Sequence, residues 1–263
     1  MNLKNKVVWL TGASSGIGEA LAYALSEKGC KLIISARRES ELERVKSSCA
    51  APENVKILFL DLSDAETLKT KVSDAVSLYG SIHILINNGG ISQRSLAANT
   101  SLEVDRKLME INYFGTIALT KYLLPHFKKQ DGGHIAVVTS LVGKFGTPYR
   151  SGYAASKHAL HGFFDALRAE VYHDNIRITM VCPGFVKTNV SVNALTEDGT
   201  NLNKMDDAQA NGMPANVFAR KMIRAIEKNK AEVNIGGKEV YGVYLKRFFP
   251  ALFNTIVRRA KVR

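Results

Sequence analysis

The sequence has little cysteine and no long apolar run. Its 263 residues include only three cysteines, Cys30, Cys49 and Cys182. An odd number of widely spaced cysteines matches neither a disulfide framework nor a metal site, so we expect reduced thiols in a cytoplasmic protein. The first residues contain no apolar signal core, and no stretch of about twenty apolar residues is present to span a membrane. We therefore expect neither export nor membrane insertion.

Metal-ligand patterns are also sparse. His158 and His161 lie about one helical turn apart, but no third ligand with suitable spacing accompanies them. We therefore expect no metal site.

The net charge of +12 is unevenly distributed. From Phe218 to Arg263 there are 12 lysine and arginine residues against three acidic ones, so nine of the 12 net positive charges lie in the last 46 residues. A basic segment of this kind can bind nucleic acid or an anionic surface. It lacks the interleaved aromatic and basic residues of known nucleic-acid-binding modules, so we expect no nucleic-acid partner.

Short β-branched runs alternate with longer segments of helical period, a pattern typical of repeated βα units. We predict a single α/β domain over residues 1–263, with a doubly wound parallel sheet of about seven strands and helices on both faces, as in Rossmann-like folds. The predicted strands are Lys6–Thr11, Lys31–Ala36, Val55–Leu60, Ile82–Asn87, His134–Thr139, Arg177–Cys182 and Ala231–Ile235. The predicted helices are Gly16–Lys28, Glu39–Cys49, Ala65–Tyr79, Leu102–Lys129, Gly152–His173 and Ala215–Lys228.

A polar loop interrupts this series within residues 189–213. From Ser191 to Met213 the chain is rich in Asn, Asp, Thr and Gly. Loops of this length in compact domains are usually lids or disordered segments. We expect the substrate to enter there.

A basic extension covers residues 240–263. Pro250 is well placed to begin a helix with Leu252, Phe253, Ile256, Val257 and Ala260 on one apolar face. We favour packing of this face at a subunit interface or as a lid over the alternative, peripheral contact with an anionic membrane. In that alternative the cations would add to binding, namely Lys246, Arg247, Arg258, Arg259, Lys261 and Arg263.

A glycine-rich turn joins the first strand to the first helix. It reads Thr11-Gly12-Ala13-Ser14-Ser15-Gly16-Ile17-Gly18. Glycines let the backbone approach a pyrophosphate, whose charge is met by N–H groups at the helix N-terminus. Glycines also serve purely structural turns, but the strand–turn–helix context favours dinucleotide binding.

The second strand ends in Ser35-Ala36-Arg37-Arg38. A fold that prefers NAD normally places a carboxylate there to bind the adenosine ribose, whereas the 2′-phosphate of NADP needs a cation. Ala36 supplies no carboxylate and Arg37 supplies the cation, which predicts NADP(H). The alternative is a solvated basic pair that opens a helix, although basic residues gain nothing from the helix dipole at that end.

Tyr153 and Lys157 lie four positions apart on a predicted helix and therefore share a face. A phenol with its ordinary pKa near 10 is a poor base at neutral pH, but a nearby ammonium and a cationic nicotinamide stabilise the phenolate. Ser140, thirteen positions before Tyr153, can hydrogen-bond a carbonyl oxygen. The alternative for the Tyr/Lys pair alone is ordinary packing with a snorkelling lysine.

Together with Asp61-Leu62, Asn87-Asn88-Gly89, Asn112 and Pro183-Gly184 with Thr188, these motifs resemble the short-chain dehydrogenase/reductase family over nearly the whole chain. Within that family the dehydrogenase/reductase member 7 group is closest in motif. The resemblance implies a catalytic tetrad of Asn112, Ser140, Tyr153 and Lys157, with Tyr153 as general acid/base. It also implies a set of cofactor contacts: Gly12, Ser14, Ser15, Gly16, Ile17, Gly18, Arg37, Arg38, Asp61, Leu62, Asn88, Gly89, Tyr153, Lys157, Pro183, Gly184, Val186 and Thr188.

The resemblance further assigns roles to single residues. Asn112 would hold a water that relays protons toward Lys157, which also holds the nicotinamide ribose. Asp61 would meet the adenine amino group, and Asn88 would support the end of the fourth strand. Pro183, Gly184 and Thr188 would frame the nicotinamide carboxamide.

These observations predict an NADP(H)-dependent oxidoreductase that transfers a hydride between nicotinamide and a small carbonyl or secondary alcohol. The substrate pocket is expected near Gln93-Arg94-Ser95, the polar loop and the region after Ser140, where Leu141, Phe145 and Tyr149 offer an apolar wall. The resemblance also implies a homodimer or homotetramer, paired through the helices around Leu102–Lys129 and Gly152–His173.

Two other functions fit parts of the sequence. A cofactor-binding redox sensor or scaffold without turnover would keep the glycine turn but lose Tyr153 or Lys157, and both are present. A sugar-nucleotide epimerase or dehydratase would need a sizeable C-terminal substrate domain, whereas only about fifty residues follow Pro214.

Overall fold

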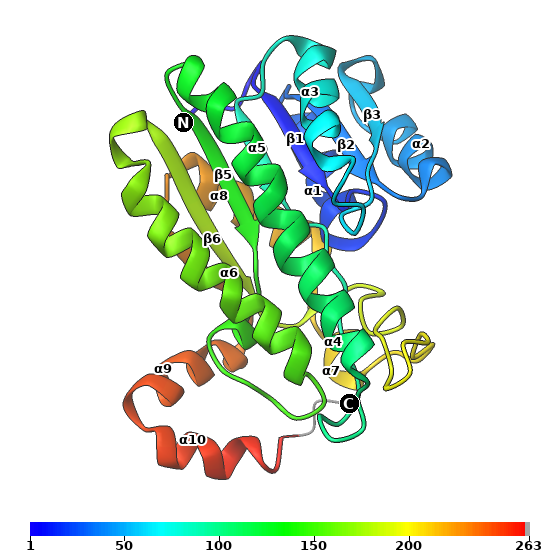
Figure 1. Ribbon diagram of the computed structural model, residues 1–263, viewed down its shortest axis with the longest axis vertical. Helices are drawn as coiled ribbons and strands as arrows, with labels where there is room; N and C mark the ends of the chain where they lie inside the picture. The colour runs from blue at the N-terminus through cyan, green and yellow to red at the C-terminus, as the bar shows by residue number, and fades with distance from the viewer. Residues whose placement is uncertain (261–263) are drawn as a thin grey trace.

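The computed structural model describes residues 1–260, and its centre is a seven-stranded parallel sheet (Figure 1). The strand order is β3-β2-β1-β4-β5-β6-β9, and every neighbouring pair is parallel. This confirms the predicted doubly wound sheet. The strands are β1 (Val7–Thr11), β2 (Lys31–Ala36), β3 (Val55–Phe59), β4 (Ile84–Asn87), β5 (Gly133–Val138), β6 (Ile176–Pro183) and β9 (Glu232–Ile235).

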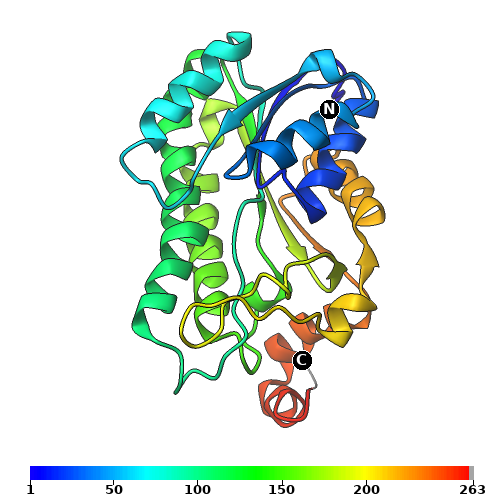
Figure 2. The same cartoon turned by 90° about the vertical axis from the view of Figure 1, so that its right-hand side faces the viewer.

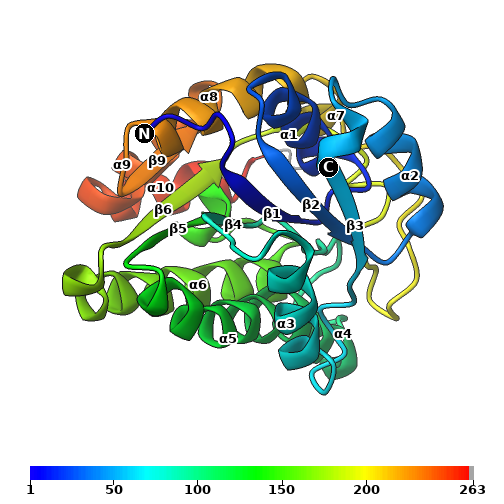
Figure 3. The same cartoon turned by 90° about the horizontal axis from the view of Figure 1, so that it is seen from above.

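Helices cover both faces of the sheet, as Figure 3 shows. One face carries α1 (Gly16–Glu27), α2 (Glu39–Ser47) and α8 (Ala215–Glu227), and the other carries α3 (Leu68–Tyr79), α5 (Gly115–Lys129) and α6 (Ser151–Glu170). Because successive strand residues point to opposite faces, Leu10 packs in the first core cluster and Trp9 in the second. A sheet covered on both sides explains why all five residues of β1 are buried.

The direction of winding reverses between β1 and β4. Val8 lies opposite Ile84 in the register of these two strands, and the chain proceeds outward from them in both directions. Ligands of open α/β sheets bind in the crevice at such a switch point, outside the carboxyl ends of the strands. The glycine turn after β1 and Asn88 after β4 both lie at this edge.

The predicted helix Leu102–Lys129 contains a π-helical segment. The chain runs through α4 (Leu102–Met109), the π-helical residues Glu110–Phe114 and α5. A Cβ at Gly115 would lie only 2.4 Å from the carbonyl oxygen of Leu62, so the helix passes very close to the loop after β3. Single π-turns occur mostly at functional sites, and this one contains Asn112.

The polar loop has more structure than the sequence predicts. The short strands β7 (Val186–Lys187) and β8 (Met213–Pro214) pair at its base, and α7 (Asp207–Ala210) lies within it. Asp206 and Gln209 of this loop are buried. The loop is therefore anchored to the body of the protein.

The C-terminal extension forms two helices at one end of the molecule (Figures 1 and 2). These are α9 (Tyr241–Phe248), which was not predicted, and α10 (Pro250–Val257), which begins at the predicted proline. Lys261 and Arg263 lie outside the described residues. Among residues 1–260 no helix combines the length and the apolar character needed to cross a membrane, and the three cysteines are free and buried.

Candidate active site

A cavity of about 1220 Å³ opens at the carboxyl ends of the strands. It exceeds the roughly 300–1,000 Å³ of a usual small-molecule site, so it has room for a cofactor and a substrate together. Of the predicted site residues, Gly18 and Asn112 do not line this cavity. Those that do are Gly12, Ser14, Ser15, Gly16, Ile17, Arg37, Arg38, Asp61, Leu62, Asn88, Gly89, Ser140, Tyr153, Lys157, Pro183, Gly184, Val186 and Thr188.

The glycine turn is packed too tightly for side chains. Gly12 and Gly16 have φ of +66° and +59°, and a Cβ at Gly18 would lie 2.1 Å from the carbonyl oxygen of Gly12. Asn88 Nδ2 donates to the carbonyl oxygens of Thr11 and Gly12 at 3.0 and 3.2 Å, which ties the turn to β4. Ser15 precedes α1 without a side-chain capping bond. The turn therefore presents the N-terminus of α1 to the cavity, which fits a pyrophosphate.

Arg37, Arg38 and Asp61 lie just after the ends of β2 and β3. Arg38 Nη2 donates to Ser14 Oγ at 3.2 Å, and both arginines of the predicted phosphate site are exposed. Burial acts to raise the pKa of Asp61, but hydrogen bonds from Ser63 and the nearby charge of Arg37 outweigh it and lower the pKa. Asp61 is therefore an anion able to accept an amino-group hydrogen bond, and Arg37 lies near it.

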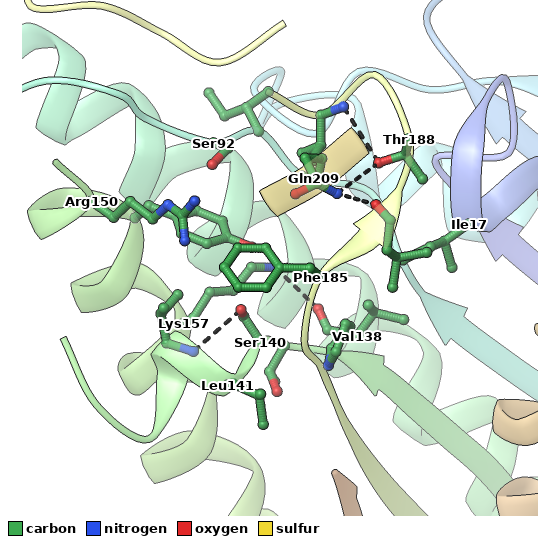
Figure 4. Close-up of a pocket in the computed structure, with 18 of the residues that line it drawn as sticks. Ile17, Ser92, Val138, Ser140, Leu141, Arg150, Lys157, Phe185, Thr188 and Gln209 are labelled. Carbon is green, nitrogen blue, oxygen red and sulfur yellow. Dashed lines mark hydrogen bonds between the residues drawn. The ribbon is translucent and has the colours of Figure 1, made fainter. Parts of the chain in front are cut away.

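The reacting groups meet at the end of β5. Ser140 follows this strand, and Tyr153 and Lys157 face it from the first turns of α6. Lys157 Nζ donates to the carbonyl oxygen of Val138 at 3.0 Å and lies 5.8 Å from the centroid of the Tyr153 ring. Figure 4 shows Ser140, Lys157 and Val138 together on one side of the cavity.

Asn112 lies behind this wall and is completely buried. Its Oδ1 accepts from the Ile91 N–H at 2.8 Å, and its Nδ2 donates to the Ile91 carbonyl and to Ser156 Oγ, both at 3.0 Å. A Cβ at Gly90 would lie 2.8 Å from Asn112 Oδ1 and 3.5 Å from Lys157 Nζ. Asn112 thus joins the loop after β4 to α6, and only the backbone at Gly90 fits between it and Lys157.

The electrostatics of Tyr153 differ from the expectation. Burial raises the pKa of Tyr153, and Ser140, Arg150 and Arg94 act in the opposite direction. Burial also lowers the pKa of Lys157 to about 8. The spacing predicts that Lys157 lowers the pKa of Tyr153, but its ammonium group lies against the Tyr153 ring and the Val138 carbonyl. Two buried arginines make that contribution instead.

Gln93 positions the start of α6. Its Oε1 accepts from the backbone N–H groups of Gly152 and Tyr153 at 2.8 and 3.2 Å, and its Nε2 donates to Thr100 Oγ1 at 2.9 Å. The sequence places Gln93 in the pocket region, but no local pattern indicates a cap that acts across 59 positions. This buried amide holds the backbone of Tyr153 in place.

The segment after β6 is held from two sides. Gln209 Nε2 donates to the Val186 carbonyl oxygen and, at 3.4 Å, to Thr188 Oγ1, as Figure 4 shows. Glu239 Oε1 accepts from the backbone N–H groups of Phe185 and Gly237, each at 3.0 Å. Neither Gln209 nor Glu239 carries a sequence signal for this role. Both support the segment that is predicted to frame the nicotinamide.

The C-terminal helices form part of the cavity wall. Phe253 is buried and packs against Phe145 with ring centroids 5.1 Å apart. Phe248 and Phe249 line the cavity but remain 68% and 63% exposed. Packing within this chain therefore covers Phe253 but leaves these two rings open to solvent at the cavity mouth.

Comparisons with known proteins agree with this geometry. The model of the short chain dehydrogenase family matches residues 6–199. A Drosophila melanogaster protein named "Dehydrogenase/reductase SDR family protein 7-like" is 40% identical over 99% of this chain and 82% of its own. The Homo sapiens "Dehydrogenase/reductase SDR family member 7" is 43% identical over 94% of this chain and 75% of its own.

Two solved structures share the fold. A short-chain dehydrogenase from Streptomyces avermitilis is 26% identical, with a TM-score of 0.81 over 97% of this chain and 96% of that one. A short chain dehydrogenase/reductase from Burkholderia phymatum, in complex with NAD, has a TM-score of 0.85 at 22% identity and covers 96% of both chains.

Proposed function

This chain belongs to the short-chain dehydrogenase/reductase family, and we propose that it transfers a hydride between NADP(H) and a carbonyl or secondary alcohol. The observation that carries the proposal is the position of Ser140, Tyr153 and Lys157 on the wall of the cavity that also contains the glycine turn. A dinucleotide on the turn and a substrate beside Tyr153 fit into the same space. The family supports a nicotinamide cofactor and an oxidoreductase activity.

The residues of the chain supply binding and proton transfer, while the bound nicotinamide supplies or accepts the hydride. Tyr153 is protonated at neutral pH because burial raises its pKa, so it acts as the acid in the direction of reduction. Ser140 hydrogen-bonds the substrate oxygen. Lys157 holds the nicotinamide ribose, and Asn112 supports the loop that packs against Lys157.

We assign the NADP preference to Arg37 and Arg38. Arg38 reaches across to Ser14 of the glycine turn, and no carboxylate occupies the end of β2 at Ala36. Dissociation constants of NADPH and NADH for the wild type, Arg37→Ala and Arg38→Ala test this assignment. We expect tighter binding of NADPH, lost largely in one or both variants. Equal affinities for the two cofactors in the wild type would contradict it.

The activity itself is tested with a panel of carbonyls with NADPH and of secondary alcohols with NADP, followed at the absorbance of the reduced nicotinamide. Turnover that disappears in Tyr153→Phe supports the oxidoreductase. The alternative, a redox sensor or scaffold, predicts tight cofactor binding without turnover of any member of the panel.

Assembly and location complete the proposal. Phe114 and Tyr122 are 49% and 41% exposed on the π-helical segment and α5. Exposed aromatic residues on this helix support pairing of two copies in a homodimer or homotetramer. Three free, buried thiols support a reducing compartment, and we propose the cytoplasm.

A further inference from the structure

The two C-terminal helices carry a concentrated group of exposed apolar side chains. Among residues 1–260, 14 large hydrophobic side chains are exposed, and six of them fall within residues 241–256. Their exposed fractions lie between 51% and 73%, and they are Tyr241, Tyr244, Phe248, Phe249, Leu252 and Ile256. Single apolar residues are normal on a protein surface, but a group of this kind indicates an interaction site.

The six side chains form two apolar stripes, one along each helix. In each stripe the spacing is i, i+3 and i+7, which places the members on one side of a helix. The stripes are Tyr241, Tyr244 and Phe248 along α9, and Phe249, Leu252 and Ile256 along α10. The other sides of the helices attach to the protein, because Leu245, Phe253 and Val257 pack in one apolar cluster with Phe145. The helices thus leave the stripes to a partner.

Four cations accompany the apolar stripes. Residues 241–260 contain Lys246, Arg247, Arg258 and Arg259 but neither aspartate nor glutamate. The three arginines are exposed, and Lys246 Nζ lies 5.6 Å from the centroid of the Phe253 ring. Aromatic and aliphatic side chains enter the boundary between headgroups and acyl chains, while nearby cations are attracted to anionic headgroups. The composition of this surface therefore matches an anionic membrane.

The same charges argue against a second copy of the chain on this surface. A two-fold axis through the stripes would bring the same patch of both copies face to face. Four cations would then face four cations, and residues 241–260 supply no acidic side chain to separate them. Like charges placed opposite each other in an interface are unfavourable. An anionic membrane instead supplies both the opposite charge and an apolar interior.

The stripes lie at the mouth of the cavity. All of their members except Leu252 line the cavity, and Figures 1 and 2 show α9 and α10 at one end of the molecule. Leu252 is 53% exposed and lies outside the cavity lining, so a substrate bound in the cavity would leave it uncovered.

We propose that the apolar stripes and the cations of α9 and α10 dock this protein on an anionic membrane, with the mouth of the cavity against the lipid. The sequence alone favours packing of this segment against protein, but the exposure of the stripes in the folded chain reverses that preference. The helices lie on the membrane surface, since no helix among residues 1–260 is long and apolar enough to cross it. The proposal goes beyond the oxidoreductase activity and does not depend on it.

Vesicle sedimentation tests the docking of the full chain. We would use phosphatidylcholine vesicles with and without phosphatidylserine, at low and at physiological salt. Binding should be stronger with phosphatidylserine and should weaken at the higher salt concentration, because ions screen exposed charges. Binding to neither kind of vesicle, or equal binding to both, would overturn the proposal.

Charge variants locate the electrostatic part of the contact. The double variant Arg258→Gln/Arg259→Gln should weaken binding by about 10- to 30-fold, because each cation near an anionic surface contributes about fivefold. The matched control is Lys129→Gln/Arg177→Gln, which removes the same charge from exposed positions at the end of α5 and the start of β6. The control should change binding by less than about threefold. Equal losses in the two variants would show attraction by net charge alone and would overturn the docking surface.

Leu252→Asp tests the apolar part of the contact without altering the cavity wall. It should weaken vesicle binding by more than about tenfold, whereas Tyr172→Asp, at a residue that is 64% exposed beyond the end of α6, should leave binding unchanged. The urea midpoint of Leu252→Asp should equal that of the wild type, because this side chain is exposed. Undiminished vesicle binding by Leu252→Asp would contradict the proposal.

A tryptophan placed in the stripe reports contact with lipid directly. Trp9 is the only tryptophan of the chain and is completely buried, so its fluorescence should not respond to lipid. In Leu252→Trp, vesicles with brominated acyl chains should quench the added fluorescence. Sedimentation without quenching would show that another surface docks. A molar mass in solution that falls in Leu252→Asp would show that the stripes pair two copies of the chain, and either result would overturn the proposal.

Discussion

Replacing Lys157 by methionine should stabilise the cofactor-free protein at neutral pH while destroying its activity. Lys157 is buried, and burial lowers its pKa from 10.5 to about 8. At pH 7 both the folded and the unfolded chain carry the ammonium charge, but the folded state carries it with less hydration. A difference of about 2.5 between the two pKa values corresponds to about 3 kcal/mol of lost stability at pH 7.

The sign of the pH dependence follows from proton binding. Between about pH 8 and 10.5 the unfolded chain retains a proton that the folded state has released, so stability rises with pH in this window. The stability contributed by the neutral amine is complete above the unfolded pKa and is lost as the pH falls through the folded pKa. By pH 10 the cost of the buried charge has fallen below about 1 kcal/mol.

Lys157→Met removes this cost at every pH. It also removes the hydrogen bond to the Val138 carbonyl, which is worth about 1 kcal/mol at either pH. We therefore expect the variant to be about 2 kcal/mol more stable than the wild type at pH 7 and to have nearly equal stability at pH 10. Urea unfolding at the two pH values, without cofactor and with equal m-values, measures the change.

Lys121→Met is the matched control because Lys121 is exposed on α5. The stability of Lys121→Met should differ only slightly from that of the wild type, and this difference should be the same at both pH values. A Lys157→Met variant whose stability difference from the wild type does not change between pH 7 and pH 10 would refute the argument that the buried ammonium is poorly hydrated.

Three further predictions concern turnover, folding and assembly. Tyr153→Phe should lower kcat by a factor of about 10² to 10⁴ because only the proton donor is lost. Its NADPH affinity, measured by fluorescence titration, should stay within about threefold of the wild type. A variant that retains most of its kcat would rule out the acid/base role. Gln93→Leu leaves the N–H groups of Gly152 and Tyr153 without their acceptor, so urea unfolding should show a loss of about 1–3 kcal/mol, and unchanged stability would mean that the cap is dispensable. Light scattering should give the wild type a molar mass that is a multiple of 28.9 kDa, and Phe114→Asp should lower this mass. A wild type that contains only a 28.9 kDa species would refute the assembly.

The sequence predicts the fold and the local motifs because their information lies in neighbouring residues. Alternation of strands and helices needs only hydrophobic periodicity, and the turn from Gly12 to Gly18 and the pair Tyr153 and Lys157 span a few positions each. These elements lie in the structure where the sequence predicts them, at the carboxyl ends of the parallel strands.

The support around these motifs depends on contacts between distant parts of the chain. The bond from Gln93 to Gly152 joins residues 59 positions apart, and the ion pair of Arg94 with Asp206 joins residues 112 positions apart. The π-helical turn at Asn112 leaves no mark on the helical period of the sequence. Burial, which sets the pKa of Lys157, likewise exists only in the folded chain.

The contact between Glu239 and the backbone of Phe185 separates the body of the protein from the C-terminal extension that follows it. The carboxylate of Glu239 holds the segment after β6, which is predicted to frame the nicotinamide. From Tyr241 onward, α9 and α10 contribute one wall of the cavity and bury a single large ring, Phe253. Exchange of the segment after Val240 would therefore alter one wall of the cavity and leave Glu239 and the residues that it holds unchanged.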